Sequence, residues 1–196
     1  MRRHLRTILW SERGQSLVEF SLVLPVVAVM ALGVVELSYA LLDSHVVTKL
    51  SREGSNLTSR DVSLADTVTA LRTMTNPPVD FASRSTVILS VIRRGDTTGT
   101  TNYGKDILAQ QYQYGAIAAA SKLTTRGVAS FGGAPDYRAP NPDTNSNLQL
   151  TNLPANLLTD GGILYVTEIF STHTPITPLD RFGISVPGTL YSIAYF

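Results

Sequence analysis

The longest apolar stretch of the chain extends from Leu17 to Leu42 and contains two carboxylates, Glu19 and Glu36. As a helix, this stretch would be about 39 Å long at 1.5 Å per residue, which exceeds the ~30 Å hydrocarbon core of a bilayer. Pro25 would break a helix in water but is tolerated in a membrane span. The pattern therefore predicts one transmembrane helix near the N-terminus.

The pattern changes after this stretch. Residues 51–63 place Gly54 among serine, asparagine and threonine, so we expect the first helix to loosen or end there. Residues 64–74 then carry apolar side chains at spacings of four, three and three, which predicts a helix with one apolar face. The Pro77-Pro78 pair stops this second helix.

The rest of the chain favours strands. Residues 85–94 are rich in β-branched side chains, and 161–176 and 188–196 read as two further strands. Residues 106–115 fit a partner strand, although a helix that continues past residue 115 is the alternative. Residues 132–160, rich in proline and asparagine, predict a long surface loop. Four strands without repeated βα units indicate an α+β body with an antiparallel sheet.

The distribution of charged residues predicts the orientation of the membrane helix. Residues 1–14 hold four arginines and one glutamate, and Asp43 follows the apolar stretch. The positive-inside rule then places the N-terminus in the cytoplasm and the body outside. Residues 15–196 hold 12 basic and 14 acidic residues, so no basic surface suited to nucleic acid remains. The chain has no cysteine, which excludes disulfides, thiol catalysis and cysteine-based zinc sites.

The sequence motifs for nucleotide binding, metal binding and hydrolysis are incomplete or absent in this chain. Gly99–Lys105 has the glycines and lysine of a phosphate-binding loop, but Asp106 replaces the hydroxyl residue that would hold magnesium. Residues 143–147 begin like a calcium loop, but Leu148 stands where glycine is needed. The three histidines share no metal-ligand spacing, and no G-x-S-x-G motif marks a hydrolase. We therefore expect no cofactor, no metal and no enzymatic activity.

Five tyrosines lie in or beside the predicted strands, and we expect them to pack the sheet, with a sugar-stacking surface as the alternative. Those tyrosines are Tyr112, Tyr114, Tyr165, Tyr191 and Tyr195.

Three interpretations compete for the apolar stretch. A secretory signal peptide has small residues at 38–40, but its apolar region usually covers only about 7–15 residues. A plain single-pass anchor fits the length but leaves Glu19 unexplained, because a charge near the bilayer centre costs about 2.5–3.5 kcal/mol. Glu36 lies about 26 Å further along the axis, near the outer interface. We expect it to be hydrated there, with helix pairing as the alternative.

The third interpretation accounts for Glu19. The segment RGQSLVEF, residues 13–20, resembles a type IV prepilin cleavage site, in which a dedicated peptidase cuts after a glycine. The resemblance implies a cut between Gly14 and Gln15, which makes Glu19 the fifth mature residue and Phe20 the sixth. The new amine on Gln15 could pair with Glu19 of a neighbouring subunit, and such pairing offsets the cost of the buried carboxylate.

The resemblance extends to the TadE-like family, minor pilins of the tight-adherence (Tad/Flp) pilus. Its N-terminal positions are Gly14, Glu19, Phe20, Pro25, Gly33, Glu36 and the triplet Arg52-Glu53-Gly54. Residues 153–176, with Glu168 among them, are similar to the C-terminal strand region of these proteins. Many type IV pilins have phenylalanine where this chain has Gln15, which leaves N-methylation of the mature end open.

The resemblance implies a three-part chain: a prepilin leader at 1–14, a transmembrane helix at 15–50 and an extracytoplasmic α+β head at 51–196. It implies a single-pass protein of the inner membrane that helps to assemble or prime the pilus. The implied partners are the prepilin peptidase, the major Flp pilin, a TadF-like minor pilin, the inner-membrane Tad assembly platform and the membrane. The alternatives are a membrane-anchored binding or adhesin-like protein, which uses the helix only as a tether, and an anchored hydrolase.

Overall fold

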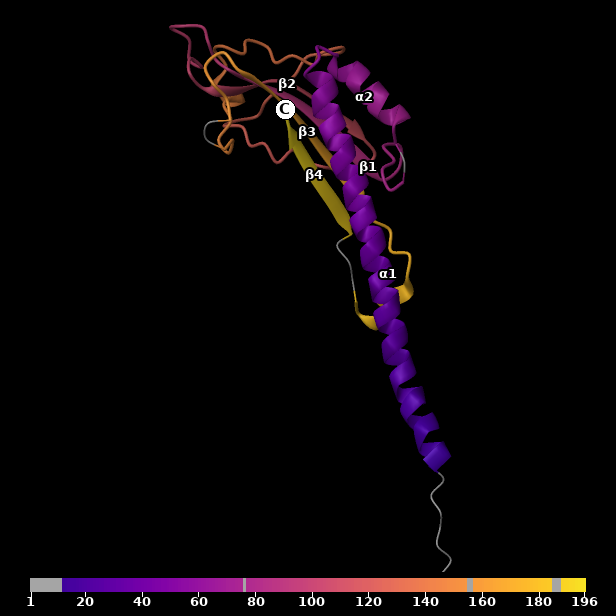
Figure 1. Cartoon of the computed structure of the whole chain (residues 1–196). Helices are drawn as coiled ribbons and strands as arrows, with labels where there is room; N and C mark the ends of the chain where they lie inside the picture. The colour runs from indigo at the N-terminus through magenta and orange to yellow at the C-terminus, as the bar shows by residue number, and fades with distance from the viewer. Residues whose placement is uncertain (1–11, 76, 155–156, 185–187) are drawn as a thin grey trace, which may run out of the picture. The chain divides into compact units, whose positions relative to one another are not determined.

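The chain forms two compact units in a computed structural model that describes residues 12–75, 77–154, 157–184 and 188–196. The first unit comprises Met1–Tyr39 with Pro175–Val186, and the second comprises Ala40–Thr174 with Pro187–Phe196. One long helix, α1 (Glu12–Thr58), contributes residues to both units (Figure 1). The expected α+β class, with an apolar N-terminal helix, is confirmed.

The first unit consists of the N-terminal part of α1 and a short loop from the far end of the chain. Pro25 lies inside the helix without ending it. Most side chains of this part of α1 are exposed, including Leu17, Phe20 and Met30. The loop, residues 175–184 as far as the structure describes it, contains the 3-10 helix η2 (Pro178–Phe182).

A four-stranded antiparallel sheet forms the second unit. Its strands are β1 (Ser85–Arg94), β2 (Asp106–Gly115), β3 (Ile163–Thr172) and β4 (Thr189–Tyr195), in the spatial order β2-β1-β3-β4. β1 pairs with β2 through a hairpin and with β3 across a long connection, as Figure 1 shows. Because β1 is central and covered on both faces, eight of its ten residues are buried.

Helices cover one face of this sheet. The second helix, α2 (Leu64–Thr73), begins where the Ser63 hydroxyl accepts a hydrogen bond from the backbone N–H of Asp66. This bond satisfies one of the donors that a helix N-terminus leaves unpaired. The apolar sides of α1 and α2 bury against alternate residues of β1 and one residue of β3. The buried set is Val47, Leu50, Leu64, Val68, Leu71, Val87, Leu89, Val91 and Ile169.

Loops cover the opposite face. Ile92 and Val166 pack there against Leu123 and Leu158, which belong to the long connection between β2 and β3. That connection contains little regular structure besides the short 3-10 helix η1 (Ser146–Leu148). The predicted surface loop at 132–160 is therefore mostly correct, although part of it contributes to the core.

The predicted strands agree with the observed ones to within a few residues. The strand assigned to 106–115 is confirmed, and the helical alternative for that segment is wrong. The physical reason is pairing: Tyr112 lies opposite Leu89, and Tyr114 lies opposite Val87. Both tyrosines pack against the same core as the helices.

The first helix ends at Thr58, within the range 51–63 where it was expected to loosen or end, and Gly54 lies inside the helix. Glycine serves a different purpose here. A Cβ atom on Gly54 would lie 2.8 Å from both Cγ2 and Oγ1 of Thr167 on β3, and 3.3 Å from Leu71 of α2. Since Thr167 is fully buried and branched at Cβ, it has little room to move. Gly54 therefore lets α1 approach the sheet closely.

Replacing Gly54 with alanine should destabilise the second unit by about 1–3 kcal/mol, because the added methyl group overpacks the α1–β3 contact. This loss opposes the gain of up to ~1 kcal/mol that alanine brings to an ordinary helix position. Denaturant unfolding of the full chain in detergent micelles, followed by the sheet signal in circular dichroism, measures the change.

Gly33, in the same helix, is the matched control, since a Cβ there meets no atom within 4 Å. Gly33→Ala should leave the unfolding midpoint unchanged or raise it. Adding Thr167→Ala to the Gly54→Ala variant should recover part of the loss. Equal effects of the two glycine substitutions, or no recovery in the double variant, would contradict the close approach.

Candidate functional site

The residues of the predicted prepilin motif all lie at the start of α1. Gly14, Gln15, Glu19 and Phe20 are all helical in the structure. The Gly14–Gln15 bond therefore lies in helical backbone, which a peptidase would have to unwind locally before it cuts.

Gln15 and Glu19 are one helical turn apart and in contact. The Nε2 amide of Gln15 donates a hydrogen bond of 3.0 Å to Oε1 of Glu19, and both side chains are exposed. Phe20, the next residue, is 64 % exposed. A carboxylate has lone pairs for about four hydrogen bonds. The bond to Gln15 thus orients Glu19 and leaves it capacity for a donor from another molecule.

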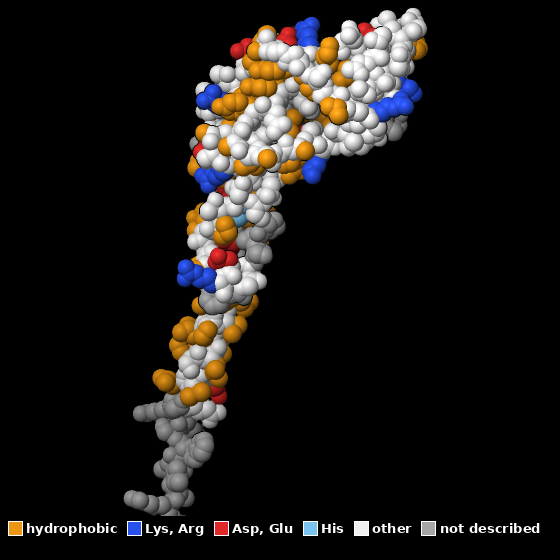
Figure 2. Space-filling view, turned by 180° about the vertical axis from the view of Figure 1, so that it is seen from behind, with side chains coloured by type: hydrophobic (Ala, Val, Ile, Leu, Met, Phe, Trp, Pro, Cys, Tyr) orange, Lys and Arg blue, Asp and Glu red, His pale blue; other side chains and the backbone are white. Residues whose placement is uncertain are grey.

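An apolar surface surrounds this motif. Within the described residues, α1 is the one helix long and apolar enough to cross a membrane, and none of its most apolar 18-residue window is buried inside the protein. Figure 2 shows hydrophobic side chains, coloured orange, on the visible face of this part of the helix. The exposed apolar side chains of the helix include Leu17, Val18, Phe20, Leu22, Val23, Leu24, Val26, Val27, Met30, Val34 and Val35. A surface of this size and composition is typical of a membrane anchor.

Glu36 is buried, so the expectation that water surrounds it is wrong. Only 1 % of the residue is exposed. Its Oε2 atom accepts hydrogen bonds from the backbone N–H of Thr177 at 2.8 Å, from the Thr177 hydroxyl at 2.7 Å and from the N–H of Ile176 at 3.1 Å. These donors all belong to the loop at 175–184. Sequence reasoning missed them because they lie about 140 residues away along the chain.

A second carboxylate on α1 has a partner that the sequence did not indicate. In the second unit, Nδ1 of His173 lies 2.7 Å from Oδ2 of Asp43. The His173 side chain is almost completely buried, whereas Asp43 is partly exposed. The sequence placed His173 near a strand end, and it does follow β3 directly. Its role here is a contact with α1, and no group of three potential metal ligands occurs among the described residues.

Glu168, a position in the C-terminal resemblance, is a buried carboxylate on β3. It accepts hydrogen bonds from the Ser121 hydroxyl, from the backbone N–H of Lys122 at 2.7 Å and from the Tyr191 hydroxyl at 2.9 Å. Burial, the hydrogen bond to Glu168 and the negative charge of Glu168 raise the pKa of Tyr191 above its ordinary value. Glu168 thus ties the loop after β2 to strand β4.

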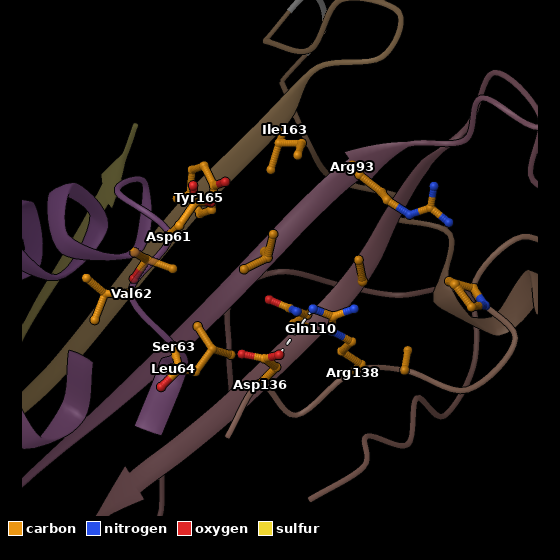
Figure 3. Close-up of a pocket in the computed structure, with 15 residues that line it drawn as sticks. Asp61, Val62, Ser63, Leu64, Arg93, Gln110, Asp136, Arg138, Ile163 and Tyr165 are labelled. Carbon is orange, nitrogen blue, oxygen red and sulfur yellow. Dashed lines mark hydrogen bonds and ion pairs between the residues drawn. The ribbon is translucent and has the colours of Figure 1, made fainter. Parts of the chain in front are cut away.

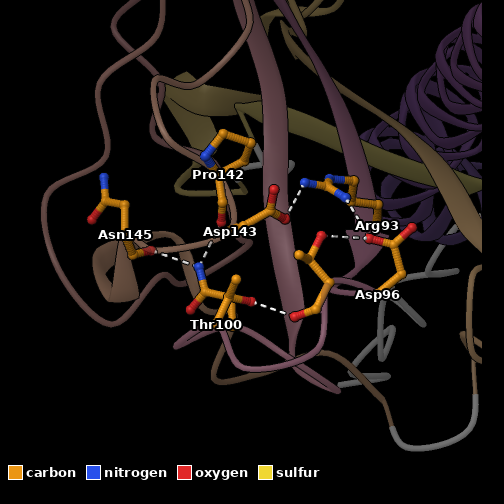
Figure 4. Close-up of polar contacts among 8 residues, drawn as sticks. Arg93, Asp96, Thr100, Pro142, Asp143 and Asn145 are labelled. Atoms are coloured by element: carbon orange, nitrogen blue, oxygen red, sulfur yellow. Dashed lines mark hydrogen bonds and ion pairs between the residues drawn. The ribbon is translucent and has the colours of Figure 1, made fainter.

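The two stretches that resembled nucleotide and calcium sites contact each other (Figure 4). Asp143 forms an ion pair with Arg93, which also lies 3.4 Å from Asp96. The side-chain amide of Asn102 donates to the backbone carbonyls of Pro142 and Asn145. These polar groups hold the β1–β2 hairpin against the long loop.

A cavity of about 600 Å³ opens in the second unit, beyond the C-terminal end of α1. Its lining combines Asp61 and Tyr165 with a paired Asp136 and Arg138, which are 3.1 Å apart (Figure 3). Its second arginine, Arg93, is the one paired with Asp143. The cavity is large enough for a small organic molecule. Its arginines already have carboxylate partners, which weakens its attraction for an anion.

Comparison with known proteins agrees with the first resemblance. Residues 14–56 match a family model described as TadE-like protein. The match begins at the glycine of the predicted cleavage site and ends two residues before the end of α1. Comparison with curated proteins gave no match, and comparison with solved structures gave none either.

Replacing Glu168 with glutamine should lower the pKa of Tyr191 toward the ordinary value of 10.0, because the substitution removes the negative charge and weakens the hydrogen bond. Burial alone should keep the value somewhat raised. Nuclear magnetic resonance of ring-labelled tyrosine during alkaline titration measures the shift, with Tyr191→Phe to assign the signal.

Tyr112 provides the control in the same sample. Burial, followed by the hydrogen bond to Tyr137, raises the pKa of Tyr112 to about 12, and Glu168 is not among the causes. The pKa of Tyr112 should therefore be the same in the Glu168→Gln variant as in the wild type. An unchanged Tyr191 signal in the Glu168→Gln variant would contradict the described contact.

The raised pKa of Tyr191 also predicts how stability depends on pH. Because folded Tyr191 keeps its proton above pH 10 while the unfolded chain loses it, the free energy of unfolding should fall as the pH rises beyond that value. Denaturant unfolding at a series of alkaline pH values measures this change.

Proposed function

Because residues 14–56 carry a TadE-like domain, we propose that this protein is a pseudopilin that helps to assemble or prime a Tad/Flp pilus used in surface adherence. The TadE-like domain associates the chain with Tad pilus systems in general, and the specific role is our proposal. The observation that carries it is the position of Glu19: an exposed carboxylate in an exposed apolar helix, five residues after Gly14.

Processing of the leader is the first step of this function. A prepilin peptidase cuts between Gly14 and Gln15, and the leader at 1–14 stays in the cytoplasm. The arginines of the leader favour this orientation, which places the second unit outside the inner membrane. The protein is then a substrate of an enzyme, and we propose no catalytic activity for it.

The N-terminal amine that cleavage creates allows neighbouring subunits to pair during assembly. Cleavage turns the backbone nitrogen of Gln15 into a cation near the membrane surface, while the Gln15 side chain holds Glu19 of the same helix. A neighbouring helix that brings its own amine to Glu19 would neutralise both charges in surroundings where an unpaired charge is costly. The neighbours that fit are the major Flp pilin and a TadF-like minor pilin, at the inner-membrane Tad platform.

The cavity of the second unit supports one other candidate, a membrane-anchored binding or adhesin-like protein. Its volume of about 600 Å³ suits a small molecule or one residue of a larger ligand. Such a protein would need α1 only as a tether. Substitution of Glu19 would then leave its function unchanged, and this distinguishes the tethered binding protein from the pseudopilin.

The Glu19→Val variant, as the only copy in the native host, should be inserted and processed normally but should form few pili. The pairing amine of a neighbouring subunit would lack its counter-charge, and loss of one partner of a buried pair costs about 3–5 kcal/mol. Pili are counted by electron microscopy, and processing is followed by the mass of the membrane-bound protein.

The matched control is Glu12→Val, which removes a carboxylate two residues before the cleavage site. Under this proposal its mature product is identical to that of the wild type, so pili should form normally. Normal pilus numbers with Glu19→Val would refute the assembly role and favour the tether.

A further inference from the structure

The loop at 175–184 has one side fixed and one side exposed. On the fixed side, Thr177 and Leu179 are buried, and the backbone of Ile176 and Thr177 donates to Glu36 of α1. This part of the loop closes over a carboxylate that would otherwise face apolar surroundings. Both the loop and this stretch of α1 belong to the first unit.

The exposed side presents large aliphatic side chains on either side of the 3-10 helix. Ile176 is 60 % exposed and Ile184 is 47 % exposed. Between them, Asp180 and Arg181 are exposed as well. Two isoleucines open to solvent in a short loop that already has a buried anchor indicate a surface that is covered in the native setting.

The position of the loop along α1 indicates what covers it. Glu36 fixes the loop among exposed apolar side chains of the helix, with Val34 on one side and Leu37 and Leu41 on the other. If the hydrocarbon core begins at Leu17, Glu36 lies about 30 Å further along the helix, at the opposite boundary of the core. Leu37 and Leu41 then follow within about 8 Å, in the interfacial region beside the loop.

We propose that the loop at 175–184 lies on the extracytoplasmic surface of the membrane, with Ile176 and Ile184 inserted at the boundary between headgroups and acyl chains. Arg181 then lies at the level of the lipid phosphates, where a cation is favoured. This inference rests on the proposed membrane placement of α1. The partner is a phospholipid surface, since the loop with the exposed isoleucines is bound to a helix whose most apolar 18-residue window has no buried residue.

The loop therefore has a mechanical role. It satisfies Glu36 at the depth where an unpaired carboxylate would enter lipid, and it sets how far α1 sinks into the bilayer. A helix fixed at one depth presents Glu19 at a defined level near the other face, because the two carboxylates are 17 residues apart on one helix. Depth control of this kind would align the subunit with its neighbours.

The absence of cysteine makes a site-specific test direct. The full chain is purified as single-cysteine variants, labelled with a nitroxide and reconstituted in vesicles of phosphatidylethanolamine and phosphatidylglycerol. The test position is Ile184→Cys. Val34→Cys on α1, 65 % exposed, reports lipid, and Val128→Cys in the second unit, 90 % exposed, reports water. Electron paramagnetic resonance then compares collisions with oxygen, which concentrates in lipid, and with a water-soluble nickel complex.

We expect the label at 184 to resemble the label at 34, with nickel collisions several-fold fewer than at 128 and oxygen collisions more frequent. If the label at 184 collides with nickel as often as the label at 128 while position 34 stays protected, the loop inference is wrong and the anchor stands. Protection at 184 from both reagents would mean a protein contact, which also overturns it. Nickel access at position 34 would refute the membrane anchor itself.

A companion variant separates lipid contact from loop folding. Glu36→Gln keeps one acceptor oxygen for the loop N–H groups, whereas Glu36→Leu removes both. The spectrum of the label at 184 should remain broad with glutamine and become narrow and mobile with leucine, together with a rise in nickel collisions. Identical spectra for the two variants would contradict the part assigned to Glu36.

Discussion

A carboxylate in an apolar helix needs a partner, and Glu19 and Glu36 of α1 meet this need differently. Glu36 is buried and accepts hydrogen bonds from a loop of its own chain. Glu19 is exposed and accepts one from Gln15 in the same helix. A charge that is removed from water without a hydrogen-bonding partner is costly. The first is satisfied by folding, which leaves the second as the position suited to another subunit.

Helix α1 has an exposed N-terminal part and a C-terminal part that is buried in the core of the second unit. Its N-terminal part exposes apolar side chains on all sides, as a membrane anchor does. Its C-terminal part buries Val47 and Leu50 in the core of the second unit, where Ser55 donates to a backbone carbonyl of β4. Gly54 permits the close contact with β3. The family-model match at 14–56 covers both parts, so the shared feature is nearly the whole of this helix rather than the anchor alone.

Local patterns predicted the elements well, because β-branched runs and helical spacing act over a few residues. The strand at 85–94 was predicted with its observed ends, and the start of α2 at Leu64 was correct. The packing role of Gly54 and the buried state of Glu36 were not predicted, for a common reason. What each residue does depends on a segment more than 100 residues away, Thr167 for one and Thr177 for the other. The hydrogen bonds of Glu168 to the loop after β2 escaped prediction in the same way.

The residues of the candidate cleavage site were found from the sequence, since a glycine followed five residues later by glutamate inside an apolar run is a local signal. The structure places the motif in the helical backbone of α1. What no local pattern could supply is the partner of Glu36, a loop about 140 residues further along the chain.

The mass of the intact protein, purified from membranes of its native host, tests the account most directly. Processing as a prepilin predicts a chain that lacks residues 1–14 and begins at Gln15. A chain that retains residues 1–14, or one that begins after Ala40, would contradict it.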